Sequence, residues 1–112
     1  MSNSTEVAYN FGQMGSVLIT GTSAVTSNGV TVGVGANAVF CAITFLEDTV
    51  FDDAGLVSTD NTMFVNSEAV QSNISGNTAV ADDETFPKGL TIYGRWTTIT
   101  LDSGAAVAYV GY

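Results

Sequence analysis

Lys88 and Arg95 are the two cations of this chain, and both stand in its aromatic C-terminal segment. Arg95 lies between Tyr93 and Trp96. A guanidinium can stack on an aromatic ring or pair with a carboxylate through two hydrogen bonds. Since eleven acids face two bases, a salt bridge within the chain or between subunits is the simplest interpretation. A ligand-binding arginine is the alternative. We therefore take Lys88, Tyr93, Arg95 and Trp96 as candidate partner-contact residues.

Clustered carboxylates offer two further kinds of chemistry. Asp52 and Asp53 could meet the acidic run at residues 82–84 as the paired carboxylates of a hydrolase, but adjacent acids on loops are usually only solvated. Asp52, Asp53, Asp60 and Asn61 carry oxygen ligands that suit calcium, although their spacing is not that of an EF-hand. A structural calcium stays open, and we assign no catalytic, cofactor-binding or metal-binding residue.

The chain contains no histidine and a single cysteine, Cys41. A serine–histidine triad and an intrachain disulfide therefore cannot form, and neither can the usual cysteine–histidine zinc sites. Cys41 lies in the apolar run AVFCAITFL, which predicts a small buried side chain rather than a reactive thiol. No glycine-rich phosphate-binding motif is present. We expect neither enzymatic activity nor a cofactor.

The net charge of −9 limits the range of partners. Nucleic acids and anionic membrane surfaces are unfavourable partners, because both are bound through Lys and Arg. The polar N-terminus lacks the basic and apolar regions of a signal peptide, so we expect synthesis in the cytoplasm. The run GVTVGVGANAVFCAITFL is long enough to span a membrane, but its Thr, Asn and Gly content favours two strands joined by a turn.

The length of 112 residues suits one domain. Val, Thr and Ile are frequent, turn-forming pairs recur at short intervals, and long helical periodicity is missing. This pattern predicts an all-β sandwich of about eight strands with jelly-roll-like connections. We assign residues 1–13 to an extended polar N-terminal arm and residues 14–112 to the sandwich. Because so short a chain gains core by sharing it, we expect a homo-oligomer, with a trimer as the first choice.

Three segments in the first half of the chain have clear β patterns. Ser16–Thr20 reads as one strand. The segment SAVTSNGVTVGV reads as a hairpin, with a type I′ turn at Asn28-Gly29. Ala38–Asp48 is a long apolar run with little alternation, which predicts a central strand with both faces covered.

The next segment is polar. Residues 52–84 predict loops with short strands, one of them near residues 62–65, and at most a single helical turn near residues 67–72. The chain ends with a predicted hairpin, whose turn LDSGA should place Gly104 in the left-handed conformation.

Between Ile92 and Ile99 the apolar positions change from even to odd numbers. A strand cannot change the face of its side chains without a bulge or a bend. We expect this irregularity at Gly94 first and at Thr97-Thr98 second. The predicted core comprises Val39, Phe40, Ile43, Phe45, Leu90, Ile92, Ile99 and Leu101.

Two segments resemble small virion proteins of tailed bacteriophages. The first, FPKGLTIYGRWT at Phe86–Thr97, is similar to an aromatic FPxGxTIYGRWT segment that leads into a C-terminal hairpin in those proteins. The second, ITFLEDTVF at Ile43–Phe51, is similar to an earlier strand of the form I-x-F-L-E-D-T-x-F. The resemblance covers about half of the chain.

The resemblance implies a structural virion protein. Small size, acidity and β content fit a capsid decoration (cement) protein best. Such proteins are commonly β-sandwich or jelly-roll trimers that bind the major capsid protein on the outside of the shell and stabilise it. The implied location is the capsid surface of the virion, after synthesis in the host cytoplasm. The alternative is a head-fibre or tail-tip module that binds a host glycan, for which Tyr93 and Trp96 would be exposed in a groove.

Overall fold

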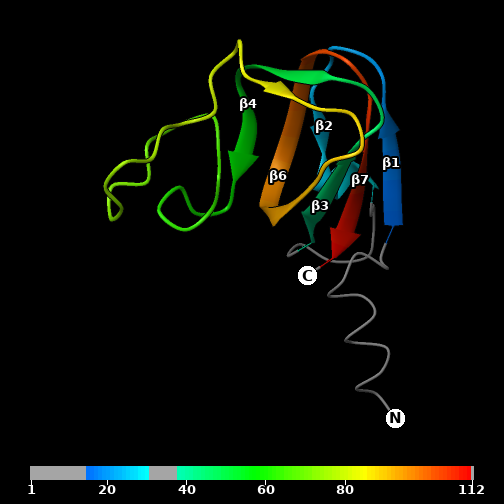
Figure 1. Ribbon diagram of the computed structural model, residues 1–112. Helices are drawn as coiled ribbons and strands as arrows, with labels where there is room; N and C mark the ends of the chain where they lie inside the picture. The colour runs from blue at the N-terminus through cyan, green and yellow to red at the C-terminus, as the bar shows by residue number, and fades with distance from the viewer. Residues whose placement is uncertain (1–14, 31–37, 112) are drawn as a thin grey trace.

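The computed structural model describes residues 15–30 and 38–111, and these ranges fold mainly into β-strands (Figure 1). Seven strands form one antiparallel sheet in the order β1-β7-β3-β6-β4-β5, and β2 pairs with β6 beside this path. The prediction of an all-β, sandwich-like domain is confirmed. The predicted N-terminal arm lies outside the described residues.

The elements follow the chain in a simple order. They are β1 (Gly15–Ile19), β2 (Val25–Thr26), the helical turn α2 (Ser27–Val30), β3 (Val39–Phe45), β4 (Thr49–Ser58), β5 (Thr85–Phe86), β6 (Thr91–Ser103) and β7 (Ala106–Gly111).

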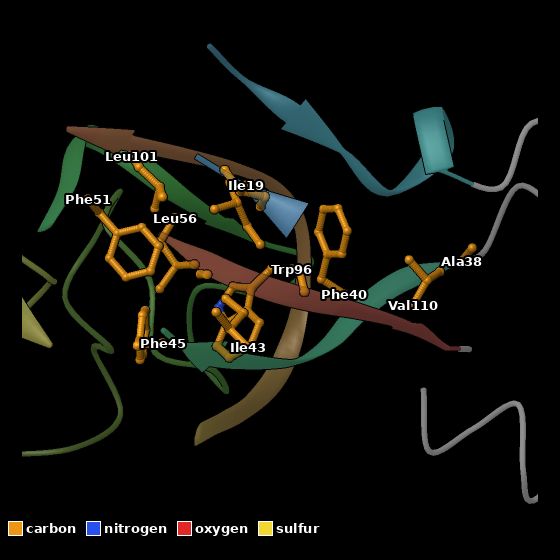
Figure 2. Packing of buried hydrophobic residues seen from close by; sticks show 13 residues of the cluster. Ile19, Ala38, Phe40, Ile43, Phe45, Phe51, Leu56, Trp96, Leu101 and Val110 are labelled. Atoms are coloured by element: carbon orange, nitrogen blue, oxygen red, sulfur yellow. The ribbon is translucent and has the colours of Figure 1, made fainter. Parts of the chain in front are cut away.

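Strand β6 belongs to both layers of the molecule. Residues 91–96 pair with β3 on one side, residues 96–103 pair with β4 on the other, and β2 pairs with Thr98 and Ile99 beyond the end of β3. The ribbon of β6 curves around the core side chains (Figure 2). One layer therefore consists of β1, β7, β3 and the first half of β6, and the other of β2, β4, β5 and the second half. The core lies between them.

The side chains of β6 change face at Thr97-Thr98. In the first half, Ile92 and Trp96 point to the core, and in the second half Ile99 and Leu101 do so. The change from even to odd positions therefore falls at the second predicted site and not at Gly94.

Gly94 has a different role, because it lies against the ring of Trp96. A Cβ atom at this position would be 2.6 Å from Cζ2 of the indole, which is closer than two carbon atoms can approach. The glycine thus lets a large ring lie directly on the backbone of its own strand.

Strand β3 also carries an irregularity. Its register shifts between Phe40 and Ala42 against both neighbouring strands. Phe40 points to the core before this shift, and Ile43 and Phe45 do so after it. The weak alternation of the AVFCAITFL run therefore has two causes: the change of face at Cys41, and the burial of Ala42 on the outer side.

The core contains most of the predicted residues. Phe40, Ile43, Phe45, Ile99 and Leu101 are confirmed, Val39 is buried beside the core, and Ile92 packs against it. The prediction was wrong for Leu90, which is 40% exposed because it lies in the turn before β6. The core also includes Ile19, Ala38, Phe51, Leu56, Trp96, Ala106, Ala108 and Val110.

The predicted type I′ turn at Asn28-Gly29 was wrong, because these residues lie in the helical turn α2. The N–H of Gly29 donates to Oγ1 of Thr26 at 3.1 Å, so a threonine caps the turn as it would cap a helix. Thr26 and Val25 pair with β6 instead. The second strand of the predicted hairpin, at residues 31–34, lies outside the described ranges. The left-handed conformation predicted for Gly104 is confirmed by its φ of 97°. The predicted C-terminal hairpin was wrong, because β6 and β7 each pair with β3, which lies between them, and not with each other.

A ten-residue strand, β4, begins before the segment that was predicted as loops and runs into it. Its pairing jumps from Phe51, opposite Leu101, to Leu56, opposite Ile99, so residues 52–55 bulge out of the sheet. Ala54 has a φ of 51° in this bulge. The two acids of the bulge hid the strand, because they break its apolar pattern. The short strand predicted near residues 62–65 and the helical turn near residues 67–72 are not formed.

The contact between Gly94 and Trp96 generates the first prediction. Gly94→Ala should lower the free energy of unfolding by about 1–3 kcal/mol, because the new methyl group must displace the indole. Gly21→Ala is the matched control, since nothing lies within 4 Å of its added Cβ, and it should change stability by less than about 0.5 kcal/mol. Urea unfolding of both variants measures the difference. If Gly94→Ala is as stable as Gly21→Ala, the indole of Trp96 can shift to accommodate the methyl group.

Candidate functional site

Trp96 was predicted as a partner-contact residue, but its side chain is fully buried within its own chain. The indole Nε1–H donates to the carbonyl oxygen of Val65 at 2.7 Å. The ring therefore ties the long β4–β5 loop, residues 59–84, to the core. It leaves no surface for a partner or a sugar to contact.

A buried asparagine organises this loop. Asn66 is 2% exposed, its side-chain oxygen accepts from the N–H groups of Glu68 and Ala69, and its amide donates to the carbonyl of Phe64. The carbonyl of Asn66 accepts from the N–H of Val80 at 2.8 Å, which brings the returning half of the loop beside the first. The loop is thus held by its own polar groups, while it exposes Met63, Val65, Val70 and Ile74.

Asp60 starts the loop and is held by hydrogen bonds. Its Oδ1 accepts from the hydroxyl of Thr62 at 2.6 Å and from the N–H of Thr62 at 2.8 Å. These bonds, the hydroxyl first, lower the pKa of Asp60 below its ordinary value of 3.8. The carboxylate thus remains ionised over a wider range of pH in the folded chain.

The calcium and hydrolase alternatives needed carboxylates that converge. Asp52 and Asp53 lie on the β4 bulge, where Asp52 accepts from the N–H of Asp53, whereas Asp60 is bonded within its own loop. In the part of the chain that the structure describes, no three Asp, Glu, Cys or His side chains come together as a metal site. Among the described residues, the carboxylates considered for calcium are therefore not gathered into such a cluster.

Tyr93 and Arg95 share the outer face of β6, opposite Ile92 and Trp96. Tyr93 is 77% exposed, and Arg95 is half-buried. Lys88 lies apart from them in the turn before β6, where its backbone N–H donates to Oδ1 of Asp48 at 3.0 Å. The structure therefore brings two of the four candidate residues together, places Lys88 beside an acidic turn, and moves Trp96 inside.

Arg95 also lines a hollow of about 230 Å³. The sequence did not reveal this hollow, because its residues come from α2, from the start of β3, from the end of β4 and from β6. The lining comprises Ser27, Asn28, Ala38, Val39, Thr59, Arg95 and Thr97.

The sequence predicted a buried side chain for Cys41. In the structure, Cys41 is only half-buried and does not belong to the core. Its Sγ lies 3.5 Å from the carbonyl oxygen of Tyr109, to which it can donate a weak hydrogen bond. Burial raises the pKa of this thiol, and its own backbone N–H and Arg95 oppose the shift only in part. A thiol that stays protonated is a poor nucleophile, so the expectation of low reactivity stands.

The two segments from which we expected a resemblance to phage proteins meet in the fold. Phe86 comes from the segment Phe86–Thr97, and Phe45 and Phe51 come from the segment Ile43–Phe51. Phe45 and Phe86 are stacked with ring centroids 5.1 Å apart, and Phe51 meets Phe86 edge to face at 5.3 Å. Such pairs contribute beyond the area they bury. Much of the shared pattern therefore serves packing.

Comparisons with protein-family models, with curated proteins and with solved structures found no match for this chain. Within residues 15–30 and 38–111, no helix has the length and apolarity that crossing a membrane requires.

The lowered pKa of Asp60 generates a prediction with a defined sign. Because the folded-state pKa is below 3.8, the ionised group adds stability at neutral pH, and this contribution disappears as the pH falls through the folded-state pKa. Asp60→Asn should therefore be less stable than the wild type at pH 7, and the difference should narrow at pH values below 3.8.

Asp82→Asn serves as the control, because it removes one charge from an exposed position of the same loop without touching the Thr62 contacts. Unfolding free energies across the acidic range measure both variants. A difference between Asp60→Asn and the wild type that does not change with pH would contradict the electrostatic origin of the effect.

Proposed function

We propose that this chain is a capsid decoration protein of a tailed bacteriophage, which binds the outer surface of the major capsid protein shell and stabilises it. The observation that carries the proposal is the contact between the two segments that resemble virion proteins. Thr49 of the segment Ile43–Phe51 pairs with Phe86 of the segment Phe86–Thr97, and Ile43 pairs with Ile92. The resemblance therefore falls on one contiguous part of the fold and not on two unrelated strands.

The exposed residues of these segments supply a contact surface. Tyr93 presents an aromatic ring to solvent and Arg95 a charge, both from the same face of a rigid strand. Tyrosine and arginine are enriched at interfaces, because they combine apolar area with hydrogen bonding. The acids lie mainly on turns, on the long loop and on the β4 bulge, where they keep copies apart before assembly.

We also propose that several copies associate, and the trimer remains our prediction. A small chain with exposed apolar side chains gains buried area in this way. Electron cryo-microscopy of the virion tests the whole proposal: density for this fold should stand on the outside of the shell. Density elsewhere in the particle would assign a different structural role.

The hollow beside Arg95 favours a second candidate, a head-fibre or tail-tip module that binds a host glycan. Asn28, Thr59 and Thr97 offer hydroxyl and amide groups to sugar hydroxyls there. A glycan array would show binding by the wild type and weaker binding by Thr59→Val, which removes one hydroxyl with little change of shape. Absence of binding across the array would exclude this candidate for the glycans displayed.

Arg95 is the residue that should separate assembly from folding. Arg95→Ala should reduce occupancy on capsids that lack the wild-type protein by at least about tenfold, because loss of a desolvated charge pair at an interface costs several kcal/mol. Its melting temperature should fall by only a few degrees. Lys88→Ala is the control, since Lys88 is exposed and pairs through its backbone. Occupancy of Arg95→Ala equal to that of the wild type would remove Arg95 from the interface.

A further inference from the structure

The layer of β1, β7, β3 and the first half of β6 has an outer face without a single charge in its two central rows. The pairing of the strands fixes these rows. Leu18, Val107, Thr44 and Thr91 lie side by side in the first row, and Ser16, Tyr109, Ala42 and Tyr93 do so in the second. We call these eight residues the uncharged face.

Three residues of the uncharged face are exposed: Ser16, Leu18 and Tyr93. Leu18 is 60% exposed and Tyr93 is 77% exposed. Ala42 is buried between Tyr93 and Tyr109, because it pairs with both tyrosines from the strand between them. A small residue flanked by two large ones makes a shallow depression that another flat surface can fill.

Two threonines of the face satisfy one another. Oγ1 of Thr44 and Oγ1 of Thr91 are 2.9 Å apart, within hydrogen-bonding distance, in neighbouring strands. A buried hydroxyl costs free energy mainly when its hydrogen bond is lost. Because this pair keeps its bond whatever covers it, covering the face would desolvate the threonines at little cost. An exposed face that carries apolar side chains and no charge is a candidate interaction site.

We propose that the uncharged face binds a second copy of this chain. The argument is electrostatic. A chain of net charge −9 repels its own copies wherever acids face each other. The two rows contain no acid, so two copies can meet here with their acidic loops directed away. A basic partner would be drawn to the acidic loops instead, and a glycan would need more polar groups than the face offers.

Strand β1, which forms the edge of the sheet beside the uncharged face, also lacks charged residues. It lies at the margin of the sheet (Figure 1), pairs with β7, and carries no charged residue over its five positions. The strand at the opposite end of the sheet, β5, has only two residues and directly follows Glu84. Edge strands are commonly protected by shortness or charge. Strand β5 is protected by its shortness, whereas β1 has neither a short length nor a charge. An edge such as β1 is suited to being covered by a second copy.

The inference deepens the proposed association of copies and rests on it, but it does not depend on capsid binding. Analytical ultracentrifugation of the purified chain tests it, with a monomer of 11.6 kDa as the reference. The wild type should show a concentration-dependent rise in mass. Tyr93→Glu and Leu18→Glu should each weaken the association by about tenfold or more, because each places like charges in the contact.

Met63→Glu is the matched control. It adds the same charge at a position that is 66% exposed, but on the β4–β5 loop, and it should change the association less than twofold. Circular dichroism and thermal unfolding confirm that all three variants are folded. A wild type that stays monomeric, or face variants that associate as tightly as the wild type, would overturn the inference. Capsid binding is measured separately, so that its failure would not be mistaken for failure of the face.

Cys41 provides a second, variant-free measurement. It lies on the same side of β3 as the uncharged face, beside Tyr109. If a second copy covers the face, the rate of Cys41 alkylation per molecule should fall as the protein concentration passes the dissociation constant. A rate that is independent of concentration, in a sample whose mass does rise, would place the association on another surface.

Discussion

The packing of one indole against its own strand determines how the two layers meet. The ring of Trp96 lies on Gly94, where no Cβ would fit, and it is fully buried. Directly after it, the side chains of β6 change face, and the strand passes from the first layer to the second. In the described sheet, β2, β3 and β4 pair with β6 directly, whereas the remaining strands are joined to it through β3 or β4. The bend at this ring therefore lies in the strand that connects the two sides of the sheet. The indole N–H also holds the long loop through Val65.

This arrangement separates the surface into two kinds. The second layer carries most of the acids, on the β4 bulge and on the loop that follows β4. The first layer turns an uncharged face to solvent, with Tyr93 as its most exposed large side chain. For a chain of this net charge, such a separation allows solubility and association together, since repulsion acts everywhere except on one face. A protein that works by assembly needs both properties.

The fold shows that most aromatic residues of the two segments proposed to resemble phage proteins serve packing. Phe45, Phe51 and Phe86 hold their motif segments together in the core, and Trp96 does the same from within. These aromatic residues are therefore needed for packing, and they do not indicate which partner the protein binds. Tyr93 is the aromatic member of these segments that is exposed to solvent, at 77%.

The sequence by itself determined the fold class, most of the core and the turn at Gly104, because these depend on local patterns of apolar residues and glycine. It also indicated that β6 must bend, since the parity of its apolar residues changes. The tertiary structure decided where the bend falls, because the burial of Trp96 is a contact between layers and not a local preference. The tertiary structure also decided that Asp52 and Asp53 lie in a bulge within strand β4 and not in a loop. Above all, it aligned Leu18, Thr44, Tyr93 and Val107, which come from four strands far apart in the chain, because only strand pairing brings such residues onto one face.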